Sequence, residues 1–301
     1  MLKRIYFALA VFIITSSSLY AELSVRKTGD SIVSDQSLTI LGIFGNYING
    51  HSFQQDAVIS HNGYQYVGYY NSNRRVCIAR RQLPDGPWEQ IEFTDYYFGS
   101  NDGHNTISVG ICQNDGTIHI AFDHHNHALN YKISQTGVTT NPSAITWDDS
   151  LFSEVRDYLE PGKTIENVTY PAFFKTPSGD MQMVYRYGYS GNGDWVIVDY
   201  SGNTHQWSNN RMFISRAGTF TDEYNTSAAR CAYPNHYMYG PNGKLHVTWV
   251  WRENTQGANH DIMYAYSEDG GTTWLNDKSS TMRIVVNGEN PQTLLNIKGA
   301  S

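Results

Sequence analysis

The residues with the clearest capacity for chemistry are five histidines that fall within 24 positions of the chain. They are His104, His119, His124, His125 and His127. A cluster of this kind can supply a general base, ligands for a metal ion, or simply polar loop surface. Chance does not readily place five histidines in so short a stretch. We therefore favour catalysis over a metal site and over plain surface polarity.

A tyrosine and an arginine in the following stretch extend this pattern. Tyr170, in VTYPAFF, is expected to precede a strand as His104 does, and Arg186, in VYRY, falls near the end of the next strand. When the glycine turns of the two stretches are aligned, Arg186 matches Asp123. His125 lies two residues after Asp123, so its side chain is expected on the same face of the strand. Considered singly, the tyrosine would be expected to pack in the aromatic core, and the arginine to form a salt bridge with a neighbouring blade. Their matched placement predicts a shared space at one end of neighbouring sheets.

The elements that must position these residues form a unit that occurs four times. Each unit has a glycine turn, an apolar strand, a second strand and a tryptophan, and the strands after the turns read YQYVGYY, TIHIAFDHH, DMQMVYRY and KLHVTWVW. A spacing of about 60 residues without helical periodicity predicts an all-β fold, a β-propeller of four-stranded antiparallel blades. The final stretch lacks a further unit, so we expect the propeller to be incomplete at its C-terminal end. The turns and closing tryptophans are Gly63, Gly116, Gly179 and Gly243, and Trp88, Trp147, Trp207 and Trp274.

The start of the chain has the composition of a secretory signal peptide. Lys3 and Arg4 precede the apolar run IYFALAVFII, and small residues follow before Ala21. We expect cleavage after Ala21, with Ser18 as a second candidate, and one catalytic domain over residues 22–301. The product would be secreted or periplasmic, monomeric and not held by a membrane. Without the two leader cations the chain has 19 basic and 28 acidic residues, which argues against nucleic acid as a partner.

Two further patterns are structural. SEDGGTTW, Ser267 to Trp274, fits an Asp box, in which Asp269 caps a hairpin turn and the tryptophan packs between strands. The chain has three cysteines, an odd number that cannot all pair within one molecule, so a disulfide scaffold is not expected.

Six motifs together indicate a protein family more specifically than the repeat or the histidine cluster does. They are DGHN, FDHHNHALNY, VTYPAFF, VYRYGYSGNGD, LHVTWVWRE and NHDIMYAYS, the last followed by the Asp box. This set resembles the β-propeller ulvan lyases and their BNR-repeat relatives, from about Asn46 to Trp274. The resemblance implies a seven-bladed propeller, here shortened, that cleaves ulvan, a sulfated polysaccharide containing uronate, by β-elimination.

The resemblance also implies roles for single residues. In those lyases a histidine before a strand and a tyrosine one blade later flank the scissile bond, while a second histidine and an arginine meet the uronate carboxylate. Carried onto this chain, His104 and Tyr170 would be catalytic, and His125 and Arg186 would bind substrate. His124 remains an alternative to its neighbour, because a shift of one residue exchanges them. No cofactor is needed for catalysis.

The resemblance also implies a zinc ion, held through histidine and cysteine, with a structural role. The candidates here share the nitrogen and sulfur ligands that Zn²⁺ accepts, and they are Cys231, His236, His246 and His260. His246 and His260 are the better two. Ala258 stands where another ligand would be expected, so the resemblance leaves a structural zinc open.

The expected mechanism rests on general acid–base chemistry. A bidentate arginine would neutralise the uronate carboxylate, a neutral histidine would remove the C5 proton, and a tyrosine would protonate the departing oxygen. For the C5 epimer, Tyr170 could serve as both base and acid.

Two other functions stay open. A sialidase-like glycoside hydrolase would need paired carboxylates or a Tyr/Glu pair with an arginine triad, and we find no such set. A non-catalytic sugar-binding propeller would need none of these groups.

Overall fold

The computed structural model describes residues 27, 29–43, 45–49, 56–221, 226–227, 230–257, 259–275, 281–282 and 292–295. The chain divides into two compact units, Met1–Ile32 and Val33–Ser301, and every strand belongs to the second. The expected signal peptide, residues 1–21, lies outside the described residues. In the part of the chain that is described, no helix has the length and apolar character needed to cross a membrane.

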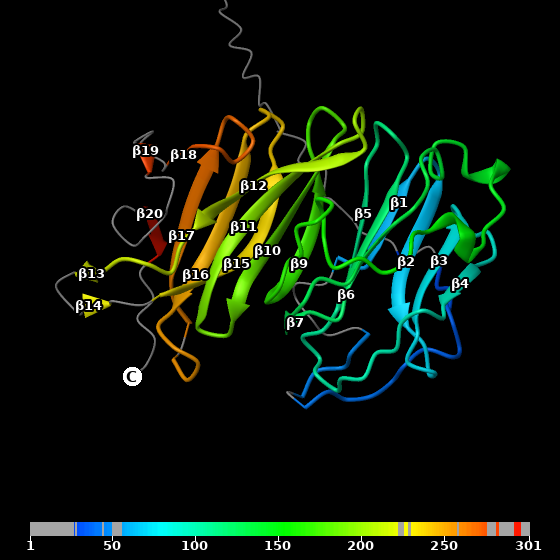
Figure 1. Cartoon of the computed structure of the whole chain (residues 1–301), viewed down its shortest axis with the longest axis horizontal. Helices are drawn as coiled ribbons and strands as arrows, with labels where there is room; N and C mark the ends of the chain where they lie inside the picture. The colour runs from blue at the N-terminus through cyan, green and yellow to red at the C-terminus, as the bar shows by residue number, and fades with distance from the viewer. Residues whose placement is uncertain are drawn as a thin grey trace, which may run out of the picture. The chain divides into compact units, whose positions relative to one another are not determined.

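Antiparallel strands form four main sheets, which follow one another in chain order (Figure 1). The first sheet contains β1 (Val58–His61), β2 (Tyr64–Tyr70), β3 (Val76–Gln82) and β4 (Glu89–Phe93). The second contains β5 (Ile107–Ile111), β6 (Ile118–Phe122) and β8 (Tyr131–Ile133). The third contains β7 (His125–His127), β9 (Val168–Lys175), β10 (Met181–Tyr189), β11 (Asn192–Ser201) and β12 (Gln206–Ile214). The fourth contains β15 (Cys231–Tyr239), β16 (Leu245–Arg252), β17 (Asn259–Ser267), β18 (Trp274–Leu275), β19 (Thr281–Met282) and β20 (Gln292–Leu295).

Smaller elements lie between and beside these sheets. They are the two-stranded pair β13 (Phe220–Thr221) and β14 (Thr226–Ser227), and the 3₁₀ turns η1 (Pro142–Ala144) and η2 (Asp149–Leu151). The first strands of neighbouring sheets, β1, β5 and β9, contact one another, as the inner strands of propeller blades do.

The glycine turns predicted from sequence are confirmed. Gly63, Gly116, Gly179 and Gly243 all have positive φ, at +76°, +68°, +90° and +74°, a region that glycine enters without steric penalty. The strands expected after them are β2, β6, β10 and β16. The all-β, propeller-like architecture is therefore confirmed. The seven blades implied by the family resemblance extend beyond the four described sheets and stay a prediction.

The expectation of four strands in every sheet holds only for the first sheet. The short strand β7 leaves the second sheet and pairs with β9 of the third, so the second sheet has three strands and the third has five. This exchange matters for function, because it carries residues from one sheet to the edge of the next.

Apolar side chains fill the spaces between adjacent sheets. One cluster joins the first and second sheets, a second joins the second and third, and a third joins the third and fourth. The closest approach requires glycine: a Cβ on Gly110 of β5 would lie 2.4 Å from the Cβ of Phe173 on β9. The sheets are thus packed tightly enough to hold loop residues at their ends in fixed positions.

The Asp box has the structural role that its sequence indicates. Oδ1 of Asp269 accepts hydrogen bonds from the backbone N–H groups of Thr272 (3.1 Å) and Thr273 (2.8 Å). Trp274 is buried and stacks on Phe213 of the third sheet, with ring centroids 5.2 Å apart. The motif closes a turn and joins two sheets.

Two buried histidines make the stability of this fold sensitive to acid. His119 lies 2.6 Å from the hydroxyl of Tyr131 through Nδ1 and 2.8 Å from that of Thr117 through Nε2. Burial lowers its pKa to about 3, although the charge of Asp115 acts in the opposite direction. Burial also lowers the pKa of His124 to about 3. Both rings are therefore neutral in the folded protein.

We expect the free energy of unfolding to fall as pH decreases from about 6.5 toward 3, because the unfolded chain binds protons that the folded chain excludes. Each histidine contributes about 1.4 kcal/mol per pH unit in this window. Denaturant unfolding at several pH values measures the slope. His119→Gln, which cannot be protonated, should reduce it by about that amount. An unchanged slope would mean that His119 takes up its proton without unfolding.

Candidate active site

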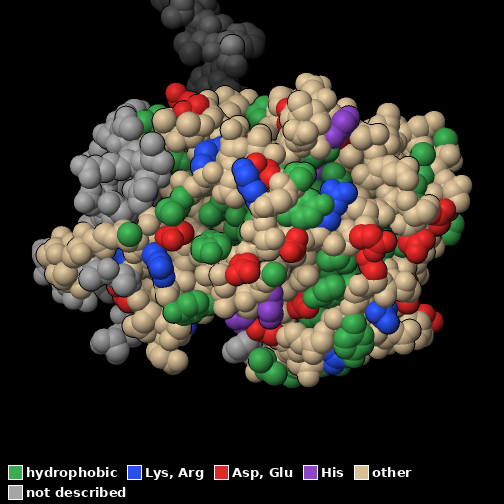
Figure 2. Space-filling view, in the orientation of Figure 1, with side chains coloured by type: hydrophobic (Ala, Val, Ile, Leu, Met, Phe, Trp, Pro, Cys, Tyr) green, Lys and Arg blue, Asp and Glu red, His purple; other side chains and the backbone are tan. Residues whose placement is uncertain are grey.

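The structure brings together the four residues that the sequence places in one space. The ring centroids of His104 and His125 are 4.5 Å apart, and each lies 6.0 Å from the ring of Tyr170. The guanidinium carbon of Arg186 lies 4.9 Å from the same tyrosine ring. Figure 2 shows histidine side chains gathered beside a hollow in the surface, in the region where Figure 1 labels β7. Their functional roles stay predictions.

The strand exchange explains how His125 reaches the third sheet. In the β7–β9 pairing His125 stands opposite Thr169, and in the β9–β10 pairing Arg186 stands opposite the same threonine. Residues that are directly opposite across strands project from the same face of a sheet. His125 and Arg186 are therefore held in one row by backbone hydrogen bonding.

The position of Tyr170 differs from the sequence-based prediction. It does not precede a strand but lies inside β9, where the register with β10 shifts between Val184 and Arg186. Tyr170 and Pro171 together face a single residue of β10, which makes this a β-bulge. Pro171 has no N–H to give to the ladder, so the interruption costs no hydrogen bond there. Tyr170 has φ +55°, a strained value that re-aims its side chain toward the histidines.

Asp102 joins the two histidines, and sequence reasoning did not identify it. Its Oδ1 lies 2.6 Å from Nδ1 of His104 and its Oδ2 lies 2.6 Å from Nδ1 of His125. Burial alone would raise the pKa of Asp102, but the hydrogen bonds from both histidines outweigh it and hold the pKa well below its usual value. A carboxylate only accepts, so it fixes the proton of each neutral imidazole on Nδ1. The aspartate of DGHN, two residues before the histidine, was the available signal.

Arg186 is more deeply placed than the sequence suggested. The sequence places it in a space shared with His104 and Tyr170, and in the structure its side chain has no exposed surface. The rings of Tyr170 and Tyr233 cover it, at 4.9 and 5.1 Å from the guanidinium carbon. Among the described residues, none of its three side-chain nitrogens has a nitrogen or oxygen hydrogen-bond partner, and the buried thiol of Cys231 is the polar group beside it. An unpaired buried charge is costly, so an anion brought to this guanidinium would offset part of that cost.

The two tyrosines that cover this arginine are held differently. The hydroxyl of Tyr233 accepts a hydrogen bond from the N–H of Gly191 at 3.0 Å and lies 2.9 Å from the hydroxyl of Ser190. Burial raises the pKa of Tyr170 to about 12, and the nearby charge of Arg186 only partly opposes this. Tyr170 therefore carries its proton at neutral pH and can act as a donor.

The remaining histidines of the cluster lie outside this group. His124, the alternative to His125, is buried, and its Nε2 accepts a hydrogen bond from the N–H of Asn130 at 2.8 Å. The structure thus brings His125 into the group and turns His124 into the protein interior. His127 is exposed, and its Nδ1 accepts from the N–H of His125 at 3.2 Å.

The four zinc candidates do not form one site. Cys231 pairs with Arg252 and His246 pairs with Met238, which places the cysteine and this histidine about 20 Å apart along the sheet. A single ion cannot bridge them, because zinc–ligand distances are close to 2 Å. His236 is exposed on β15. The backbone of His260 pairs with Trp251, near the cysteine end, and its side chain lies outside the described residues. A structural zinc stays a prediction.

Another group meets the geometric requirement for a metal more closely. Within the described residues, Asp102, His104 and His125 place one candidate ligand atom each within 4.8 Å of one another. The Nδ1 atoms of both histidines already bond to the carboxylate, so the cluster is complete as a hydrogen-bonded unit.

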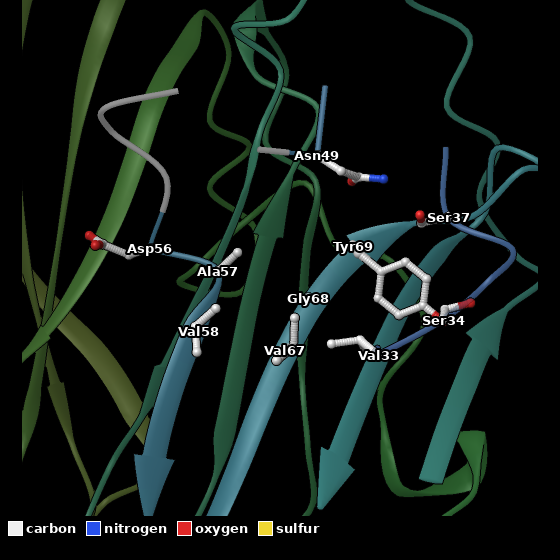
Figure 3. Close-up of a pocket in the computed structure, with 10 residues that line it drawn as sticks. All are labelled: Val33, Ser34, Ser37, Asn49, Asp56, Ala57, Val58, Val67, Gly68 and Tyr69. Atoms are coloured by element: carbon white, nitrogen blue, oxygen red, sulfur yellow. The ribbon is translucent and has the colours of Figure 1, made fainter. Parts of the chain in front are cut away.

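A separate pocket of about 520 Å³ lies against β1 and β2 (Figure 3). Its lining is mostly small and aliphatic, with Asn49, Asp56 and Tyr69 as the larger polar groups. Figure 3 shows the Asp56 carboxylate directed away from the Tyr69 ring. None of the candidate catalytic residues contributes to this pocket, so the site is defined by the histidine cluster.

Comparison with solved structures supports the fold. A crystal structure titled polysaccharide lyase Uly1 is similar with a TM-score of 0.71 and 21% identity, covering 88% of this chain and 67% of that one. A PL25 ulvan lyase structure bound to -[GlcA(1-4)Rha3S]- is similar with a TM-score of 0.60 and 16% identity, covering 85% of this chain and 59% of that one. At these identities the likeness concerns the fold alone.

Sequence comparison gives relatives and a family. The long isoforms of ulvan lyase from Alteromonas sp. (strain LOR) and Pseudoalteromonas sp. (strain PLSV) are each 30% identical over 287 residues, covering 79% of this chain and 27% of the relative. The short isoform from the first organism is 24% identical over 288 residues, covering 77% of this chain and 51% of the relative. The chain thus spans about a quarter to a half of these relatives. A family model described as BNR repeat-containing family member matches residues 64–298. The chain belongs to the BNR repeat-containing family.

Proposed function

We propose that this chain is a polysaccharide lyase that cleaves a sulfated, uronate-containing polymer of the ulvan type by β-elimination. The observation that carries the proposal is the buried Arg186, which lies under the ring of Tyr170, while the ring of His104 lies 6.0 Å from that same tyrosine ring. The relatives named as ulvan lyases, and the similar fold with a bound glucuronate–sulfated rhamnose repeat, support this choice of substrate.

The proposed reaction begins at C5 of the uronate. Nε2 of His104 accepts the C5 proton, and the electron pair left on C5 forms the C4–C5 double bond as the bond from C4 to the glycosidic oxygen breaks. Tyr170 gives its phenolic proton to that departing oxygen. The products are a sugar with a free hydroxyl and a chain that begins with an unsaturated uronate. No water enters the reaction, and atoms and charges balance.

Each participant has a feature that suits its task. The bond from Nδ1–H of His104 to Asp102 leaves Nε2 as the nitrogen that lacks a proton in the neutral ring. The raised pKa of Tyr170 favours the acid role over the base role. Arg186 supplies positive charge where negative charge develops on the carboxylate, and a direct bidentate contact requires the Tyr170 ring to move off the guanidinium.

The two alternative functions fit less well. A glycoside hydrolase needs a pair of carboxyl groups about 5–9.5 Å apart across the sugar. At this cluster Asp102 already serves both histidines as acceptor, and its low pKa does not suit a general acid. A sugar-binding module would not need an uncompensated buried cation next to an acid and a base.

Incubation of the purified protein with ulvan and with unsulfated uronate polymers tests the function. We expect a rise in ultraviolet absorbance from the conjugated unsaturated uronate, with ulvan the best substrate, and we expect His104→Asn to abolish it. New reducing ends without that absorbance would instead identify a hydrolase. Binding without either product would identify a sugar-binding module.

We also infer export of the mature protein. The signal-like composition of residues 1–21 and the cleavage expected after Ala21 support it. N-terminal sequencing of the protein recovered from a secreting host should begin at Glu22 or, with the alternative site, at Leu19.

A further inference from the structure

The end of β10 carries two tyrosines with unusual exposure. Tyr187 is 47% exposed and Tyr189 is 48% exposed, whereas Tyr185 on the same face is 2% exposed. Residues two apart on a strand project to the same side, and their Cα atoms are about 7 Å apart. The tyrosines of β10 therefore pass from the core between the sheets, at Tyr185, to two exposed side chains at the end of the strand.

These rings begin one residue from the candidate active site. Across the third sheet, Tyr187 stands opposite Val168, and His127 stands opposite Val168 on the other side. The next row contains His125, Thr169 and Arg186, whose side chains project from the opposite face of the sheet. Both rows lie at the end of the third sheet that carries the candidate site. Figure 1 shows the β10–β11 hairpin reaching the same lower edge of the sheets as β7. A polymer that leaves the site across this edge of the third sheet meets the two exposed tyrosines.

The strand that carries the tyrosines is firmly held. The hydroxyl of Thr169 donates to the carbonyl of Gly188 at 2.7 Å and accepts from the N–H of Asn126 at 2.8 Å. The side-chain amide of Asn192 donates to the hydroxyl of Tyr189 at 2.6 Å. At Gly188, with φ +126°, an added Cβ would lie 2.4 Å from the carbonyl oxygen of Asn192. Little conformational entropy is left to lose when a ligand binds here.

We propose that Tyr187 and Tyr189 form a sugar-stacking subsite for the part of the polysaccharide that lies beyond the scissile linkage. This rests on the proposed function. A tyrosine ring offers a rigid apolar face to the C–H face of a pyranose and a hydroxyl to its polar edge. Two rings are far too small for a stable protein–protein interface, which needs about 1,200 Å² or more of buried surface. A neutral aromatic face also accepts neighbouring sugars whatever their charge.

Kinetics on long and short substrates test the subsite. For Tyr187→Ala/Tyr189→Ala we expect KM on the polymer to rise about 10-fold with kcat within twofold, because stacking helps bound substrate and transition state equally. On the shortest oligosaccharide that is still cleaved, KM should be unchanged. Met212→Ala, which truncates an exposed side chain on β12, is the matched control and should behave as wild type. Unchanged KM on the polymer, or a fall in kcat alone, would overturn the subsite.

Affinity electrophoresis in gels containing ulvan separates failure of the subsite from failure of the proposed function. If wild type forms no unsaturated product but is retarded by the polymer, the lyase function fails, and the double variant still tests the subsite. Loss of retardation in the double variant, with an unchanged circular dichroism spectrum, supports stacking. Equal retardation of wild type and double variant refutes it.

Discussion

Arg186→Leu should remove most of the lyase turnover and at the same time make the folded chain more stable. The guanidinium is fully buried, with no nitrogen or oxygen partner among the described residues, so only two tyrosine rings and a thiol replace the hydration that folding removes. A leucine in the slot between Tyr170 and Tyr233 ends that penalty. We expect the free energy of unfolding to rise by about 1–3 kcal/mol, measured by denaturant titration. Turnover at saturating polymer should fall on the order of 10²-fold or more, because the charge acts where the transition state becomes negative.

Arg186→Lys sharpens this expectation. An ammonium keeps the charge but lacks the planar fork, so the lysine variant should regain little turnover. It should also lack the stability gain of the leucine variant, since a charge remains buried. A leucine variant that is destabilised but fully active would show that Arg186 is a structural residue in the wall between two sheets. If the leucine variant is inactive and also destabilised, the buried charge carries no net penalty, and the stability part of the prediction is wrong.

The fold could be predicted from the sequence because its signals are local. Glycine turns with positive φ, apolar alternation after each and the Asp box all depend on a few neighbouring residues. The strand exchange was not predictable in this way. His125 to His127 form a strand of three residues that pairs with the next sheet, and no local preference distinguishes that pairing from a loop.

The grouping of four candidate side chains could be predicted from the sequence, but neither Asp102 nor the geometry of the group could. Repeat alignment pointed to His104, His125, Tyr170 and Arg186, because equivalent positions in neighbouring sheets reach the same end. It could not show that a bulge at Tyr170 places this ring over Arg186, since bulges depend on pairing across strands. The zinc candidates show that matching residue types alone do not predict a site. Residue types matched a zinc site, but strand register, which no composition encodes, separates Cys231 from His246.

Asp102 is the residue whose role follows from the structure alone, and Asp102→Asn should lower turnover about 10³-fold while leaving the fold intact. The carboxylate holds both imidazoles with the proton on Nδ1. An asparagine amide can donate as well as accept, so each ring can turn its unprotonated nitrogen toward the amide and lose the orientation needed to take the C5 proton. Wrong-tautomer substitutions of this kind cost up to about 10⁴ in kcat.

A positioning role predicts a change that a purely structural role would not produce. In wild type, the ¹⁵N spectrum of the imidazoles should show His104 and His125 protonated on Nδ1 when neutral, and in Asp102→Asn the signal should shift toward a mixture of tautomers. Asp115→Asn is the matched control, because Asp115 also pairs with a histidine, His205 at 3.0 Å, but at the turn between β5 and β6. It should keep wild-type turnover. If Asp102→Asn loses activity while both rings retain their tautomers, the carboxylate acts through its negative charge and not by orienting the base.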